Sequence, residues 1–300
     1  MEKIKLLVSF SGGETSAYML WWILKNWINI YEIKIVFANT GEENEETLLF
    51  VKKCAEYFKC EIIWVEALVN PENKKGTRHV IVNFQTASRN GQPFEDVIKK
   101  YGIPNQNAPH CNRELKLAPL RSYLKSIGWK KYYTAIGIRS DEFDRVNSAR
   151  IKRRLLYPLI ENKPMTKPKI NQWWNMQPFR LNLKGYEGNC KTCWKKSDNK
   201  LYTIINQDKN KFNFFEEMEK KYENYLPESV LKLKHERGEQ INFPLRFFRK
   251  NRSVEDLVKE AELFTKKITD DASIMDCELD LFDLIEEAEE SCDIYSECKN

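Results

Sequence analysis

Residues 8–16, which read Val-Ser-Phe-Ser-Gly-Gly-Glu-Thr-Ser, constrain the fold of this chain more than any other stretch. They follow an apolar run over residues 4–8 that is typical of a buried strand, and they precede an apolar run over residues 17–24 that is typical of a helix. A strand, a glycine turn and a helix in this order point free backbone N–H groups and the positive end of the helix dipole at an anion. An ordinary tight turn would also use glycine, but four hydroxyl side chains within eight positions favour an anion site.

The first 66 residues alternate between strand and helix patterns. We expect strands over residues 4–10, 33–38 and 62–65, and helices over residues 15–28 and 44–59. Short links between such elements predict right-handed crossovers and a parallel sheet. Ligands of parallel sheets bind beyond the carboxyl ends of the strands, so the glycine turn and residues 39–43 (Asn-Thr-Gly-Glu-Glu) are expected to share one site.

The pattern is coarser beyond the third strand. We expect a loop over residues 67–94, helices over residues 95–101, 115–126 and 166–175, and a fourth strand over residues 132–136. From residue 200 to residue 267 the pattern is helical, with charged faces and with aromatic stripes that are typical of core packing.

The charge of the chain is unevenly distributed. The formal net charge is +5, yet residues 270–300 hold 12 Asp or Glu against one Lys. The basic remainder of the chain suits an anionic nucleotide or a nucleic acid. A lysine-rich composition from a low-GC genome would also produce some of this excess of positive charge. No apolar run reaches the ~20 residues of a membrane span, and the first residues enter a strand rather than a signal peptide. We therefore expect a cytoplasmic protein without a membrane partner.

Five stretches together resemble one known superfamily. They are residues 8–16, 39–43, 111–120 (Cys-Asn-Arg-Glu-Leu-Lys-Leu-Ala-Pro-Leu), 137–145 and 188–193. In this order they resemble the PP-loop adenine-nucleotide α-hydrolase superfamily, and within it the phosphoadenosine/adenosine phosphosulfate reductase-like branch with its phage-encoded and DNA-modification relatives. The resemblance implies a Rossmann-like α/β domain with a parallel sheet over residues 1–196. A mostly helical region (197–269) and an acidic tail (270–300) would follow.

The resemblance also implies an adenine-nucleotide site. The residues expected to bind the nucleotide are Ser9, Ser11, Gly12, Gly13, Thr15, Ser16, Asn39, Thr40, Gly41, Lys116, Gly137, Arg139 and Arg145. Hydroxyls and backbone amides would hold phosphate or sulfate oxygens, and Lys116 and Arg139 would neutralise them during the reaction. A lone Lys or Arg is usually a solvated surface charge, but these cations lie in or beside the predicted strand ends.

One position departs from the pattern of the superfamily. Members that cleave ATP usually carry an acidic residue where this chain has Thr15, and only the neighbouring Glu14 offers a replacement. The departure moves the expectation from ATP towards an activated sulfate, either adenylyl sulfate or its 3′-phosphorylated form.

The eight cysteines favour metal or redox chemistry over disulfides, because the chain shows no secretory signal. Cys54 and Cys60 lie in an apolar segment and are expected to be buried and inert. Residues 110–120 and the pair Cys190 and Cys193 resemble the frame of reductases that carry an iron–sulfur cluster, with His110 in place of a first cysteine. The resemblance implies Cys111, Cys190 and Cys193 as ligands of a [4Fe–4S] cluster. The fourth position of the cluster would be open or held by His110. A Cys₃His zinc site or three unrelated core cysteines are the alternatives.

The reductases carry a nucleophilic cysteine in a Glu-Cys-Gly-x-His setting near the C-terminus. Glu297 and Cys298 match only two of these residues, and an exposed thiol in a frayed terminus is the ordinary alternative. Acidic neighbours raise the pKa of a thiol, which argues against a nucleophile at this position. Cys298 is the weakest of the catalytic candidates.

Three functions follow as hypotheses. The first is an iron–sulfur enzyme that binds an adenine nucleotide and reduces or transfers sulfur, with a thiol reductant such as thioredoxin as its partner. The second is an ATP-dependent enzyme that inserts sulfur into tRNA or DNA, whose phosphates the basic residues 150–154 would contact. The third is a nucleotide-binding regulator with a structural zinc and no catalysis.

Overall fold

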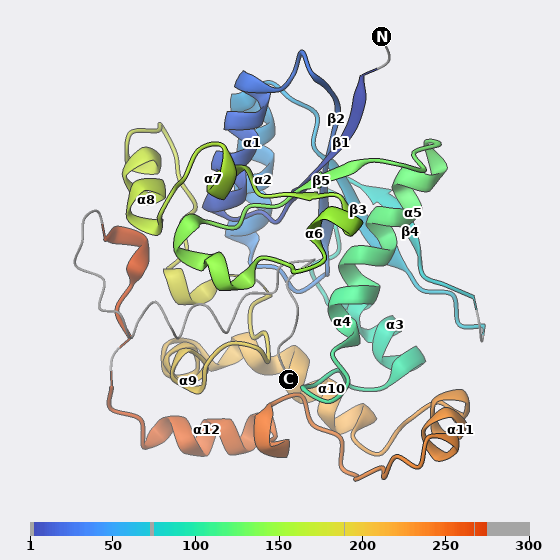
Figure 1. Ribbon diagram of the computed structural model, residues 1–300. Helices are drawn as coiled ribbons and strands as arrows, with labels where there is room; N and C mark the ends of the chain where they lie inside the picture. Colours follow the sequence, from blue (N-terminus) through green and yellow to red (C-terminus); the bar gives the residue numbers. More distant parts are fainter. Residues whose placement is uncertain (1–2, 73–74, 189, 267, 275–300) are drawn as a thin grey trace.

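The computed structural model describes residues 3–72, 75–188, 190–266 and 268–274 (Figure 1). Its centre is a six-stranded sheet in the order β4-β3-β2-β1-β5-β6. The strands are β1 (Ile4–Phe10), β2 (Tyr31–Asn39), β3 (Ile63–Leu68), β4 (Arg78–Val82), β5 (Tyr133–Ala135) and β6 (Leu155–Leu156). Within the described residues each neighbouring pair is parallel except β3 with β4. The predicted α/β fold with a parallel sheet is confirmed.

Helices cover both faces of this sheet. Leu6 and Val8 of β1 join one core with α1 (Glu14–Asn26), α2 (Glu45–Phe58) and α8 (Lys167–Asn175). Leu7, which points the other way, joins a second core with α5 (Ala118–Ser126). Burial on both faces explains why the central strands read as continuous apolar runs in the sequence.

Residues 67–94 are not the continuous loop that the sequence pattern indicated. They contain the edge strand β4, which pairs antiparallel with β3 from Leu68–Arg78 to Trp64–Val82. Every residue of β4 is exposed or half-buried, because this strand lies at the edge of the sheet. An edge strand of this kind leaves no hydrophobic period in the sequence.

The helix expected over residues 115–126 begins earlier than predicted. It is continuous from α4 (His110–Asn112) through a π-helical turn (Arg113–Leu117) into α5. A π-helical turn within an α-helix is uncommon and is frequently found at functional sites. The two short helices that follow are α6 (Arg150–Arg153) and α7 (Pro158–Glu161).

The C-terminal region is mostly helical, as predicted. Its helices are α9 (Asp198–Gln207), α10 (Asn213–Tyr222), α11 (Glu228–Glu236) and α12 (Val254–Glu262). Phe212 and Phe215 pack with Phe94 of α3 (Gln92–Tyr101) and with Leu115 in one shared core, so these aromatic residues pack as expected. The 3₁₀-helices among the described residues span Ser140–Arg145, Gly185–Glu187, Lys209–Phe212, Arg249–Asn251 and Asp271–Ser273. No helix in the described part of the chain is long and apolar enough to cross a membrane.

Candidate functional site

The turn between β1 and α1 is free of strain only with glycine at position 12. Gly12 has φ +83°, and a Cβ at this residue would lie 2.7 Å from Cγ2 of Thr47. Gly13 caps α1 in an extended conformation, so the N–H groups of the first helical turn point out of the carboxyl edge of the sheet. The backbone therefore has the geometry of an anion site.

Hydroxyl groups hold the turn in shape. The Ser16 hydroxyl donates to the Gly13 carbonyl (2.9 Å) and accepts from the Ser11 hydroxyl (2.9 Å) and the Ser11 N–H (3.3 Å). Gly137, beyond the end of β5, approaches the same helix so closely that a Cβ would lie 3.0 Å from Cα of Ser16. Ser16 thus fixes the turn from inside, and Gly137 brings the next strand end against it.

One pocket, which we name the glycine-turn pocket, gathers most of the predicted nucleotide ligands. Its predicted residues are Ser11, Gly12, Gly13, Thr15, Ser16, Gly137, Arg139 and Arg145. Residues that were not predicted as ligands also line it, among them Glu43, Glu142, Lys167, Lys184, Gly185 and Ala272. Lys167 is the first residue of α8, and Thr166 is the N-cap of this helix. A helix start of this kind is too common in sequences to mark Lys167 as a ligand.

Carboxylates position the two arginines of this pocket. Nε of Arg139 lies 3.0 Å from Oδ1 of Asp141, and its NH1 lies 3.6 Å from Oε2 of Glu142. Arg145 pairs with the other oxygen of Glu142. Burial alone would raise the pKa of Glu142, but Arg139 and Arg145 hold it below its usual value. The arginines are therefore fixed in place before any ligand arrives.

Glu14, the acid next to Thr15, is engaged elsewhere. Its carboxylate accepts from Nε and NH2 of Arg180, both at 3.0 Å, and from the Leu181 N–H at 3.2 Å. Its backbone carbonyl accepts from the Trp174 indole at 2.9 Å. Although Glu14 borders the pocket, its carboxylate oxygens hold the chain at residues 180–181 against the start of α1.

A second space, which we name the cysteine cavity, lies next to the glycine-turn pocket. Its lining residues are Thr40, Phe94, Cys111, Asn112, Leu115, Lys116, Cys190, Cys193, Trp194 and Phe215. The helix that contains the π-helical turn supplies Cys111 and Lys116, and a separate turn supplies Cys190 and Cys193. The fold thus brings the three predicted thiol ligands to one cavity, and it places Lys116 there rather than in the glycine-turn pocket.

Glu43 joins the two spaces. It lines the glycine-turn pocket, and its Oε1 accepts from the Thr40 hydroxyl (3.0 Å) and from the Cys190 thiol (3.7 Å). This acid is the last residue of the Asn-Thr-Gly-Glu-Glu stretch, where the sequence predicted a site but no role for Glu43. The signal was its position as the second acid after a predicted strand end.

Other predicted ligands lie outside both spaces. Asn39 is fully buried, and its Nδ2 donates to Oε1 of Glu66 (2.6 Å) and to the Ser88 carbonyl (2.8 Å). Ser9 is buried within β1, and Gly41, at φ +83°, packs against Gly91. These residues shape the carboxyl edge of the sheet rather than the pocket wall.

His110 does not line the cysteine cavity. Its Nε2 lies 3.1 Å from the Gly102 carbonyl oxygen, its ring packs on Tyr101, and burial lowers the pKa of the imidazole to about 4. Across the described residues, no group of three or more His, Cys, Asp or Glu side chains surrounds a single ion position. Cys292 and Cys298 lie outside the residues that the structure describes.

Comparison with known proteins identifies the family of this chain. Residues 5–177 match the phosphoadenosine phosphosulfate reductase domain. The nin region protein ORF290 of Escherichia phage lambda is 35% identical over 199 residues, which cover 65% of this chain and 67% of that protein. Two Methanocaldococcus jannaschii proteins, MJ0973 and MJ0066, are each 30% identical over 45% and 51% of this chain, and the matches span about a quarter of their own length (26% and 27%). The chain belongs to the phosphoadenosine phosphosulfate reductase family.

Proposed function

We propose that this protein binds an adenine nucleotide through its phosphate or sulfate groups in the glycine-turn pocket and reduces or transfers sulfur at the cysteine cavity. The observation that carries the proposal is the contact of Glu43 with Cys190. Through it, a pocket suited to anions and a cavity lined by three thiols share one side chain.

The glycine-turn pocket supplies both kinds of group that an oxyanion needs. The first turn of α1 offers backbone N–H groups, and Arg139 and Arg145 offer guanidinium groups that Glu142 holds in place. Thr15 and the pairing of Glu14 with Arg180 leave the first turn of α1 without an uncommitted acid for a magnesium ion. The pocket therefore suits adenylyl sulfate or its 3′-phosphorylated form better than an ATP that is to be cleaved.

The cysteine cavity suits a [4Fe–4S] cluster held by Cys111, Cys190 and Cys193. Thiolates are the ligands of such clusters, and the Lys116 ammonium group in the same cavity would stabilise them. Three thiols that line one common space supply the ligand type of such a cluster, and a single zinc is the alternative. When bound, the cluster would supply electrons or hold a sulfide for the reaction.

The protein's own residues would prepare the substrate. Arg139, fixed by Asp141 and Glu142, would orient the phosphate or sulfate group, and the Ser11–Ser16 hydroxyl pair would keep the turn open around it. Oε1 of Glu43 would accept the proton of the Cys190 thiol when the sulfur of Cys190 binds the cluster as a thiolate. A thiol reductant such as thioredoxin would complete a reductase cycle.

A second candidate is ATP-dependent sulfur insertion into tRNA or DNA. One observation favours it, because the side chains of Lys152 and Arg153 in the basic segment are exposed, and exposed cations suit the phosphates of a nucleic acid. A nucleotide-binding regulator with a structural zinc is the third candidate.

The test combines metal analysis with ligand titration. We would measure iron, labile sulfide and zinc in anaerobically purified protein, and binding of ATP, adenylyl sulfate and its 3′-phosphorylated form. Iron with sulfide that is lost in a Cys111→Ser, Cys190→Ser, Cys193→Ser variant, but kept in a Cys60→Ser control, would support the cluster. One zinc without sulfide would exclude it, and pyrophosphate release that requires added tRNA or DNA would favour the second candidate.

A further inference from the structure

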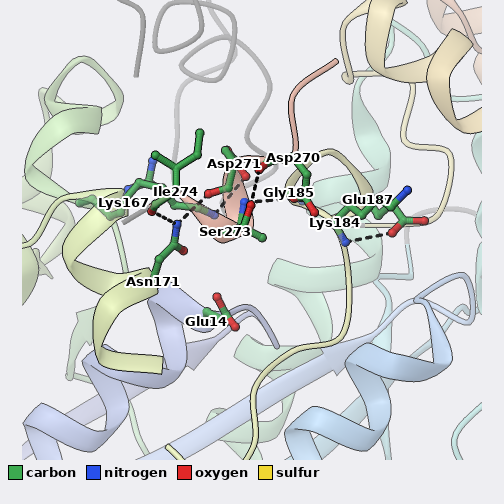
Figure 2. A network of polar contacts seen from close by, with 12 residues as sticks. Glu14, Lys167, Asn171, Lys184, Gly185, Glu187, Asp270, Asp271, Ser273 and Ile274 are labelled. Atoms are coloured by element: carbon green, nitrogen blue, oxygen red, sulfur yellow. Dashed lines mark hydrogen bonds and ion pairs between the residues drawn. The ribbon is translucent and has the colours of Figure 1, made fainter. Parts of the chain in front are cut away.

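We propose that the segment Asp270–Ile274, which we name the strap, is an autoinhibitory element that competes with the phosphate or sulfate groups of the ligand at the glycine-turn pocket. Figure 2 shows the strap with Lys167, Asn171 and Gly185 around it, and in Figure 1 its short helix lies beside α8. The inference rests on the proposed function, because it takes the glycine-turn pocket to be an anion site.

Three anchors hold the strap through its backbone and through Asp270. Nδ2 of Asn171, which is fully buried, donates to the carbonyls of Asp271 (2.7 Å) and Ile274 (2.8 Å). NH2 of Arg180 donates to the Ala272 carbonyl (2.7 Å). The Gly185 N–H donates to Oδ1 of Asp270 (2.9 Å), so the strap is fastened to the wall of the pocket that Gly185 and Ala272 both line.

Asp271 brings a negative charge to the cations of this pocket. Its side chain is almost buried, and its Oδ1 lies 3.6 Å from Nζ of Lys167, which lines the pocket. Oδ1 accepts no hydrogen bond from the described residues, so charge attraction to Lys167 holds it. Although burial works in the opposite direction, Glu142, Asp141 and, more weakly, Asp271 raise the pKa of the Arg139 guanidinium. The Asp271 charge therefore acts on two cations that would otherwise attract an anionic ligand.

The strap fits only because residue 185 is glycine. A Cβ on Gly185 would lie 1.5 Å from Oδ1 and 2.5 Å from Cγ of Asp271. Any larger residue must either rotate the Asp271 side chain or lift the strap, and both movements take the carboxylate away from Lys167. A Gly185→Ala substitution is thus a way to move the Asp271 carboxylate away from Lys167.

Charge gives the direction of the effect. A ligand phosphate and the Asp271 carboxylate repel each other and are attracted by the same cations, so each weakens binding of the other. The sequence after Ile274 adds ten further Asp or Glu residues against one Lys, which is charge of the same sign. The strap is therefore a competitor of the ligand rather than a lid that closes on it.

The first experiment measures binding of ATP and adenylyl sulfate by calorimetry to the full chain and its variants. We expect Gly185→Ala and Asp271→Asn to bind about tenfold more tightly than wild type. Gly76→Ala, where a Cβ meets nothing within 4 Å, and Asp96→Asn on α3 are the matched controls and should bind like wild type. Equal or weaker binding by both test variants would overturn the strap proposal while leaving the proposed function intact.

The second experiment uses wild type alone, so it tests the strap even where a variant folds poorly. Hydrogen exchange of the peptide that contains residues 270–274 is measured in wild type with and without ligand. We expect the ligand to increase exchange, because the strap that leaves loses its contacts with Asn171, Arg180 and Gly185. Without these anchors the bonds within the strap, from the Ala272 N–H to Asp270 and from the Ile274 N–H to Asp271, open more often. Unchanged or slower exchange with bound ligand would overturn the strap. If neither wild type nor any variant binds ATP or adenylyl sulfate, both the anion site and the strap proposal are overturned.

Discussion

Both Nε and NH2 of Arg180 lie 3.0 Å from carboxylate oxygens of Glu14. Glu14 is the first residue of α1, where a carboxylate interacts well with the helix dipole but opposes a ligand anion at the same helix end. Arg180 neutralises this carboxylate and also binds the Ala272 carbonyl. One guanidinium thus connects the start of α1 to the strap.

We predict that Arg180→Lys destabilises the protein by about 2 kcal/mol, because an ammonium group cannot reproduce a bidentate pair that is largely buried. Urea unfolding would measure the change. Arg121→Lys, at an exposed position of α5, is the control and should lie within about 0.5 kcal/mol of wild type. Equal stability of the two variants would show that a single charge at position 180 is sufficient.

Glycine at position 12 gives the next prediction. Gly12→Ala should destabilise the fold by about 2 kcal/mol, because alanine at φ +83° is strained and its Cβ would overlap Thr47. Gly13→Ala is the comparison, since a Cβ there meets only the Ser11 hydroxyl at 3.7 Å and should cost less than about 1 kcal/mol. Thermal or urea unfolding separates the two, and an equal loss would mean that the turn geometry is not the cause.

The regular part of the fold could be predicted from the sequence. Strands β1, β2 and β3 are buried on both faces, so their apolar runs were recognisable, whereas the exposed edge strand β4 had no period to recognise. The glycine turn was recognisable for a related reason, because glycine and hydroxyl residues follow directly after a buried strand.

The candidate site could be predicted only where its residues lie in recognisable local patterns. The approach of Lys167 to Asp271, and of Glu43 to Cys190, joins segments more than 100 residues apart, and no local pattern records it. His110 shows that neighbours in the sequence need not share a site. It stands next to Cys111, yet its ring turns to the Gly102 carbonyl.

Glu219 predicts how stability depends on pH. Its side chain is buried, its oxygens accept from the N–H groups of Phe247 (3.3 Å) and Val254 (2.9 Å), and burial raises its pKa from 4.5 to about 7. Between these values the folded protein binds more protons than the unfolded chain, so the free energy of unfolding falls as pH rises. The stabilisation is complete below about pH 4.5 and is lost as pH rises through 7, on the order of 3 kcal/mol in total.

The measurement is urea unfolding at pH 5, 6, 7 and 8. Glu42, whose pKa burial also raises to about 7, acts in the same direction, so Glu219→Gln should remove part of the slope rather than all of it. Glu216→Gln, on the same helix α10, should keep the wild-type slope. A slope that Glu219→Gln leaves unchanged would contradict the assignment.

Asn39 gives the last prediction, because its amide touches a buried carboxylate. Nδ2 lies 2.6 Å from Oε1 of Glu66, so Asn39→Asp would place two carboxylates in contact inside the protein. Such a pair of carboxylates keeps one proton, and its raised pKa makes the variant lose stability as pH rises.

We expect Asn39→Asp to be about 3 kcal/mol less stable than wild type at pH 8 and to recover most of this loss at pH 5, where the pair is protonated. Asn39→Ala should instead lose about 2 kcal/mol at both pH values, because Glu66 loses a donor without gaining a charged neighbour. Asn162→Asp at an exposed position is the control for the added charge. Urea unfolding at the two pH values measures all three, and a loss in Asn39→Asp that does not depend on pH would show that the Asn39–Glu66 contact is not what stabilises this edge of the sheet.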